Sequence, residues 1–69
     1  MTEYLAIFEY DADGWSAHVP DLPGCVATGS TRAEVDENIR SAVTLHIEAL
    51  RADRIPIPAP STVAGVVAA

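Results

Sequence analysis

The chain has 69 residues, enough for one domain over residues 1–69, and 49% of them are hydrophobic, as in a folded protein. Its net charge is −6 and all four basic residues are arginines, which excludes the basic patch of an autonomous nucleic-acid binder. With no apolar run near the roughly 20 residues of a membrane helix, no basic signal-peptide region and one cysteine, we expect a cytoplasmic protein.

Small size predicts association. A core this small supplies only a few kcal/mol, and small domains are commonly stabilised further by disulfides, metals or oligomerisation. Cys25 has no partner for a disulfide within the chain, and the sequence has no Cys/His cluster of the kind that binds structural zinc. We therefore expect a homodimer or a larger homo-oligomer. The acidic charge suits a basic protein partner, although it also serves solubility alone.

Residues 4–10 (YLAIFEY) are aromatic and β-branched enough for a strand, and both faces are apolar at its centre. An Asp-Gly turn at residues 11–14 predicts a hairpin. In the return strand at residues 15–19, apolar and polar residues alternate more regularly than in the first strand. One of its faces carries Trp15, Ala17 and Val19, and the other carries Ser16 and His18.

A turn rich in proline and glycine at residues 20–24 leads to a third short strand at residues 25–28. Thr31 is a suitable N-cap for the helix that follows, and Glu34 completes a capping box. The first half of the chain is therefore predicted to be a three-stranded antiparallel meander.

One long helix is predicted at residues 32–53. At 1.5 Å per residue it is roughly 33 Å long, against about 20 Å for a six-residue strand, so we expect it to overhang the sheet. Its apolar stripe follows the helical period. The stripe consists of Val35, Ile39, Ala42, Val43, His46, Ile47 and Leu50.

The C-terminal part alternates proline with apolar residues at 55–60, a pattern that blocks edge-to-edge strand pairing. Residues 63–68 (VAGVVA) are predicted to form either a fourth strand or a frayed tail. If they pair beside the first strand, the pairing is parallel and the first strand is central. The predicted fold is α+β, in the order β-β-β-α-β.

The residues do not support an enzyme. Cys25 and His18 are a conceivable nucleophile and base, but they have no third group to orient them. His46 lies on the apolar stripe, where packing is commoner than metal binding. Three carboxylates lie near turns, where they usually serve the turn and solubility rather than a metal ion. They are Asp11, Asp13 and Asp21. We predict no catalytic residues, no metal and no cofactor.

One motif is more specific. It reads Gly14-Trp15-x-Ala17-x-Val19-Pro20-Asp21-Leu22-Pro23-Gly24-Cys25. This segment resembles the HicB family of antitoxins. The resemblance continues through nearly the whole chain, in Gly29-x-Thr31-x-x-Glu34, in Asn38-Ile39-x-x-Ala42-Val43 and in Ile55-Pro56-x-Pro58-x-Pro60-Ser61.

The resemblance implies a partial RNase H-like fold without nuclease activity, in an antitoxin of a type II toxin–antitoxin module. Such an antitoxin binds a small basic HicA-type ribonuclease, which has a double-stranded-RNA-binding-like fold and a catalytic histidine. Binding blocks the toxin's active site and spares messenger RNA. Many relatives add a C-terminal DNA-binding domain, for which we expect no room in this chain, and hence no DNA binding by this chain alone.

Two alternatives stay open. The chain is an orphan oligomeric binding or scaffold domain without a toxin, or it is a small hydrolase that uses His18, Cys25 or Asp21. For partner contacts we predict Asp21, Leu22 and Pro23, as an exposed turn. These three residues could equally serve only to shape the turn.

Overall fold

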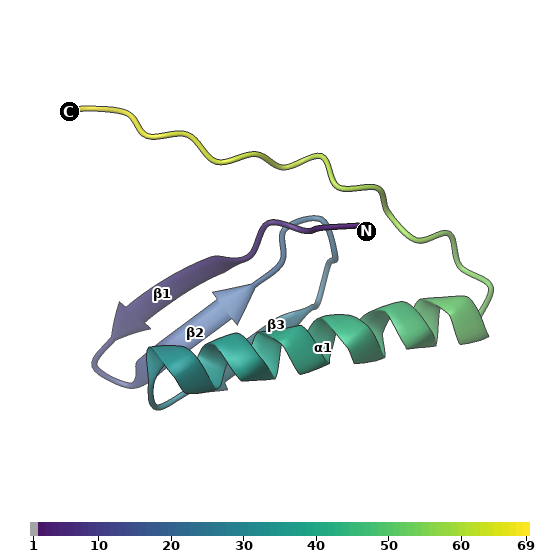
Figure 1. The fold of residues 1–69 in the computed structure, drawn as a ribbon, viewed down its shortest axis with the longest axis horizontal. Coiled ribbons are helices and arrows are strands. Elements are labelled where there is room, and N and C mark those ends of the chain that lie inside the picture. The colour runs from purple at the N-terminus through teal and green to yellow at the C-terminus, as the bar shows by residue number, and fades with distance from the viewer. Residues whose placement is uncertain (1) are drawn as a thin grey trace.

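The computed structural model describes residues 2–69, and its elements follow the predicted order (Figure 1). Three antiparallel strands, β1 (Ile7–Asp11), β2 (Gly14–His18) and β3 (Val26–Gly29), form a sheet in the order β1-β2-β3. The helix α1 (Arg32–Ala52) packs on one face of this sheet. The α+β class, the meander and the single long helix are confirmed. Within the described residues, no helix has the length and apolarity to cross a membrane.

The hairpin between β1 and β2 forms at the predicted Asp-Gly turn. Gly14 has φ 113°, a conformation that favours glycine, and the Asp13 amide donates to the Asp11 side chain at 2.8 Å. This turn sets Tyr10 opposite Trp15 and Phe8 opposite Ala17. The predicted faces of β2 follow, with Ala17 buried in the core and Ser16 exposed on the other side of the sheet.

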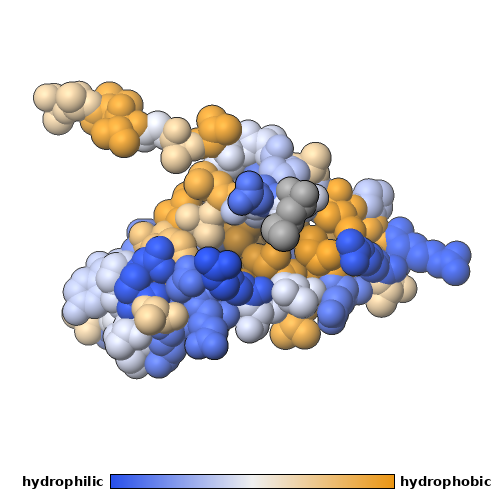
Figure 2. Space-filling model, in the orientation of Figure 1, coloured by the Kyte–Doolittle hydropathy of each residue, from blue (hydrophilic) through white to orange (hydrophobic). Residues whose placement is uncertain are grey.

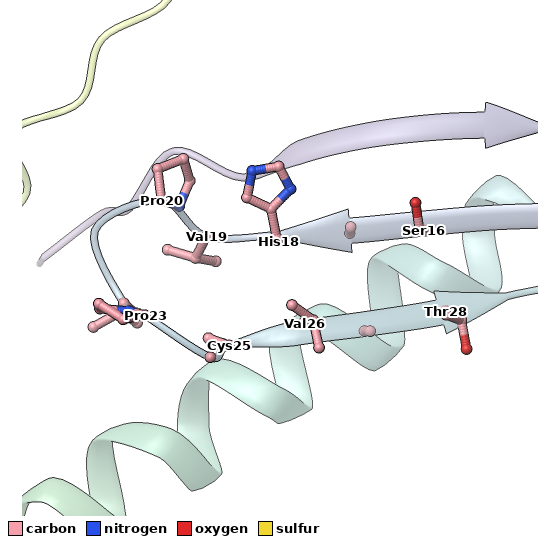
Figure 3. Close-up of a pocket in the computed structure, with 12 residues that line it drawn as sticks. Ser16, His18, Val19, Pro20, Pro23, Cys25, Val26 and Thr28 are labelled. Carbon is pink, nitrogen blue, oxygen red and sulfur yellow. The ribbon is translucent and has the colours of Figure 1, made fainter.

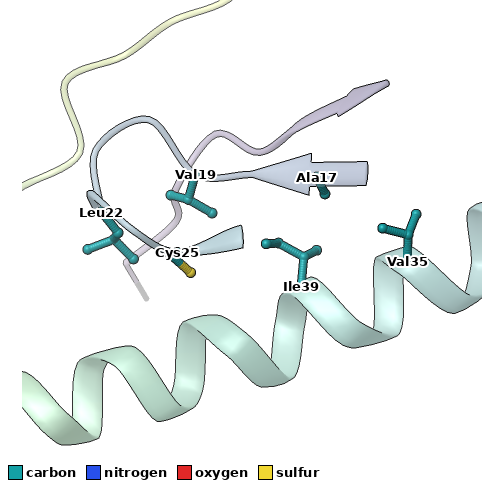
Figure 4. Close-up of a cluster of buried hydrophobic side chains, with 6 residues drawn as sticks. All are labelled: Ala17, Val19, Leu22, Cys25, Val35 and Ile39. Atoms are coloured by element: carbon teal, nitrogen blue, oxygen red, sulfur yellow. The ribbon is translucent and has the colours of Figure 1, made fainter. Parts of the chain in front are cut away.

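The core lies between the sheet and the first half of α1 (Figure 4). Each of its six side chains is at most 3% exposed. They are Ala17, Val19, Leu22, Cys25, Val35 and Ile39. Farther along, α1 extends past the strands, as its length predicts, and Leu45 is 66% exposed there (Figure 1).

The helix begins at the predicted N-cap. Thr31 Oγ1 accepts the Glu34 amide at 3.0 Å. The return bond differs from the predicted capping box, because Glu34 Oε1 accepts the amide of Ser30 at 3.0 Å, one residue before the cap. The carboxylate therefore stabilises the turn between β3 and α1 as well as the helix start.

Of the two possibilities left open for residues 63–68, the structure shows the unpaired tail and not the fourth strand. Val63, Val66 and Val67 are 87%, 102% and 92% exposed, and in the described chain β1 pairs only with β2. The first strand is therefore an edge strand and not a central one. Ile7, on the sheet face away from α1, is 37% exposed. The physical reason is that the preceding residues, Ser61 and Thr62, are hydrogen-bonded to Asp21, between β2 and β3.

Candidate partner-binding surfaces

The turn predicted to contact a partner closes on itself. The Val19 amide donates to the Cys25 carbonyl at 3.1 Å, and the Leu22 and Cys25 amides donate to the carbonyls of Val19 and Leu22, each at 3.0 Å. This geometry turns the Leu22 side chain into the core, where it is 0% exposed. The expectation that Leu22 is exposed is therefore wrong, because three backbone hydrogen bonds fold the loop inward. Pro23 is exposed, and its contact role stays a prediction.

Asp21 holds the C-terminal segment against this loop. Its carboxylate accepts the Ser61 amide and hydroxyl at 2.9 and 3.0 Å, and the Thr62 amide and hydroxyl at 3.0 and 2.7 Å. The bond from the Thr62 amide, with the others, lowers the pKa of Asp21 to about 2. We call this set of four bonds the Asp21 clasp. The sequence did not predict this clasp, because Ser61 and Thr62 lie 40 and 41 residues from Asp21 along the chain.

We expect the Asp21 clasp to open in acid. A carboxyl group with a lowered pKa favours the bound state above its usual pKa of about 4, and this advantage is lost as the pH falls through its bound pKa. With a bound pKa of about 2, the clasp holds at neutral pH and weakens between pH 4 and 2. An NMR titration should show the Ser61 and Thr62 amide shifts changing together with a midpoint near pH 2.

The matched control is Asp21→Asn, in which this shared transition of the Ser61 and Thr62 amides should disappear. A midpoint near pH 4 in the unsubstituted chain would instead mean that the Asp21 carboxylate is not held by the tail.

The sheet face away from α1 carries a shallow groove beside the same loop. Its strand residues are Ser16 and His18 on β2 and Val26 and Thr28 on β3, all labelled in Figure 3. Pro20 and Pro23 continue it, and its volume is about 450 Å³. Val26 is 65% exposed here, so the groove offers apolar surface and one imidazole to a partner.

The geometry argues against a Cys25–His18 dyad. Cys25 is 2% exposed in the core, whereas His18 follows Ala17 on β2 and lies on the opposite sheet face. Burial raises the pKa of the Cys25 thiol, which keeps it in the neutral form. A neutral thiol is a poor nucleophile, so this pair cannot act as the nucleophile and base considered from the sequence.

The three carboxylates considered for a metal are likewise not brought together. Asp11 and Asp13 lie on the β1–β2 hairpin, and Asp21 is bound to the tail. Among residues 2–69, no three metal-ligating side chains cluster closely enough to hold an ion.

Acidic side chains gather where the hairpin meets the start of α1. The two turns are in contact, since a Cβ on Gly14 would lie 3.0 Å from the Gly29 carbonyl oxygen. Tyr10 and Trp15 pair across the hairpin with ring centroids 5.1 Å apart, and Tyr10 is 69% exposed. We call this surface the acidic end. It consists of Tyr10, Asp11, Asp13, Trp15 and Glu34.

The neighbouring charges of α1 form ion pairs with one another. Asp36 accepts from Arg40 at 2.9 Å and from Arg32 at 3.4 Å, and the Arg40 bond is the main cause that lowers the pKa of Asp36. Arg32 also stacks on the Phe8 ring, 3.5 Å from its centroid. The carboxylates of the acidic end thus face solvent beside arginines that are already paired. Sequence patterning missed this surface, although the Asp-Gly turn predicts that Tyr10 and Trp15 face each other.

Residues 4–69 match the HicB-like antitoxins of bacterial toxin–antitoxin systems. The chain belongs to this family. It is 36% identical over 59 residues to Antitoxin HicB 2 of Photorhabdus laumondii, covering 86% of this chain but 42% of that protein. Membership of an antitoxin family agrees with the prediction that the chain is not an enzyme.

Solved HicB structures share the fold. A chain of the HicA3 and HicB3 toxin–antitoxin complex superimposes with a TM-score of 0.71 at 35% identity, covering 86% of this chain and 69% of that one. The Antitoxin HicB3 crystal structure gives 0.68 at 33% identity, covering 83% of this chain and 42% of that one. The chain thus spans less than half the length of HicB 2 and of the crystallised HicB3.

Proposed function

We propose that this chain binds and neutralises a small basic toxin of the HicA type, an mRNA-cleaving enzyme, in the cytoplasm. The observation that carries the proposal is the family match over residues 4–69. The likeness at 35% identity to a chain of a solved HicA3–HicB3 complex supports it.

Charge and surface chemistry favour the acidic end as the toxin contact. The net charge of −6 attracts a basic partner and speeds its association. Exposed tyrosine and tryptophan side chains are the residues that most often carry binding energy at protein interfaces. The exposed Tyr10 ring, which contacts the partly buried Trp15, lies next to the hairpin carboxylates Asp11 and Asp13 and so combines both features in one place.

The direct test is a titration of the toxin with this protein. The product of a short basic reading frame beside the gene is purified, and its ribonuclease activity is measured as the 69-residue chain is added. We expect activity to fall to zero at a fixed stoichiometry. Unchanged activity with the well-folded chain would refute the proposal.

Charge reversal locates the contact. Asp13→Lys should weaken toxin binding about tenfold or more by calorimetry, because this side chain belongs to the acidic end. The matched control, Glu48→Lys, makes the same change in net charge near the far end of α1 and should bind nearly as tightly as the unsubstituted chain. Equal weakening in the two variants would mean that net charge alone matters.

A second pair of variants separates the acidic end from the contact predicted from sequence. Tyr10→Ala removes an exposed ring at the acidic end, and Pro23→Ala changes the exposed part of the loop that Asp21 and Leu22 complete. We expect Tyr10→Ala to weaken toxin binding and Pro23→Ala to leave it unchanged. The opposite result would place the toxin on the loop.

The alternative, an orphan oligomeric domain, is favoured by one observation, the exposed apolar segment at residues 63–69. A gene neighbourhood without a short basic reading frame, together with stable self-association, would support it.

A further inference from the structure

The C-terminal segment leaves the body of the molecule after the Asp21 clasp. Figure 1 shows residues beyond Thr62 running away from the sheet and α1, and Figure 2 shows apolar side chains along this projection. Val63, Val66 and Val67 are 87% to 102% exposed, so the rest of the chain buries almost none of their surface. Valine favours strands, and an unpaired extended segment with these side chains is suited to pair with the exposed edge strand of a sheet.

The same molecule has a matching open edge. β1 is an edge strand in the sheet order β1-β2-β3, so the backbone donors and acceptors on its outer side face away from β2. A strand of the length of residues 63–68 spans about 20 Å, enough to cover the five residues Ile7–Asp11.

Beside this edge lies a groove that is lined in part by apolar side chains and in part by polar ones, among them Asp36 and Arg40. It runs between the segment leading into β1 and the helix α1, and its volume is about 590 Å³. Its apolar lining comprises Tyr4, Leu5, Ala6, Phe8, Val19, Ile39 and Val43. A strand added to the outer edge of β1 would point every second side chain toward the helix side of the sheet. Residues 63–68 are apolar on both faces, so either register would place valine or small side chains over this groove.

The path of the chain selects whose edge receives the segment. The Tyr4 hydroxyl donates to the Pro58 carbonyl just before β1, and the Asp21 clasp then holds Ser61 and Thr62 on the β2–β3 loop. Beyond these anchors the described chain leaves its own β1 edge unpaired, because β1 pairs only with β2 and the valines of residues 63–68 remain exposed. The segment and the edge of one copy are therefore both free for a second copy.

We infer that residues 63–68 of one copy pair with the outer edge of β1 in a second copy, whose own segment pairs back in the same way. Each copy offers one segment and one edge, so the exchange closes as a two-fold dimer. The exchange would cover the valines and the apolar part of the groove together, which supplies the extra burial that a 69-residue chain lacks. This inference does not depend on the toxin.

The first test is the oligomeric state, measured by sedimentation at several protein concentrations. The unsubstituted chain should be a dimer, and Val66→Asp with Val67→Asp should be a monomer with an unchanged far-ultraviolet spectrum. The control, Ala33→Asp with Ser41→Asp, adds the same two charges at exposed positions of α1 and should remain a dimer. A monomeric unsubstituted chain, or a dimer that persists in Val66→Asp with Val67→Asp, would overturn the inference.

The second test identifies the edge. An equal mixture of isotope-labelled and unlabelled chains is examined by filtered NMR, which reports contacts between different copies only. We expect contacts between the methyl groups of Val66 or Val67 and protons of Ala6 or Phe8 in the other copy. Contacts within one copy alone would show that the segment returns to its own β1, and no contacts would show that it stays free; either result overturns the exchange.

Discussion

Leu22→Ala should lose about 2–5 kcal/mol of unfolding free energy, the usual range for a fully buried leucine. The side chain is 0% exposed, and the core around it has only six buried members, so little nearby structure can move to fill the cavity. Small domains have only about 5–10 kcal/mol in total, so the loss is a large share of the stability. Urea denaturation, followed by circular dichroism, measures it.

Leu45→Ala is the matched control, because it makes the same substitution on a leucine that is 66% exposed. Its cost should stay below about 0.5 kcal/mol, since alanine is also the better helix former. Leu22→Asp should prevent folding, because it buries an unpaired charge. Equal, small losses for Leu22→Ala and Leu45→Ala would mean that the loop is exposed, as the sequence alone predicts.

Gly29→Ala should lose about 1–3 kcal/mol, the usual cost of forcing extra atoms into a close contact. A Cβ at this position would lie 2.6 Å from the Val35 amide nitrogen, 3.0 Å from Val35 Cα and 3.1 Å from the Glu34 carbonyl carbon. All three atoms belong to the backbone of α1, so no flexible side chain can make room. The start of α1 would have to move away from β3.

Gly65→Ala provides the comparison, because a Cβ there would meet no atom within 4 Å in the single chain. Its stability, measured at low protein concentration with the same denaturation assay, should equal that of the unsubstituted chain. If Gly29→Ala is as stable as Gly65→Ala, then α1 does not approach β3 as closely as the structure has it.

Elements with local signals could be predicted from the sequence. The Asp-Gly turn specifies the β1–β2 hairpin, because few residues tolerate the φ of 113° at Gly14. Alternation along β2 gives the buried face of Ala17 and Val19, and the Thr31 cap starts α1 where predicted. The motif from Gly14 to Cys25 also identified the family, which the match over residues 4–69 confirmed.

Several features depend on contacts between distant parts of the chain, and only the tertiary structure decided them. Leu22 looks like a turn residue by its neighbours, yet it is buried in the same core cluster as Val35 and Ile39 of α1. Asp21 reads as a solvated carboxylate, yet it binds Ser61 and Thr62. By itself the sequence determined the turns, the strand faces and the helix, since periodicity and turn chemistry act over a few residues. The edge position of β1 and the path of the tail required the whole fold, because hydrogen bonds across some 40 residues leave no local pattern.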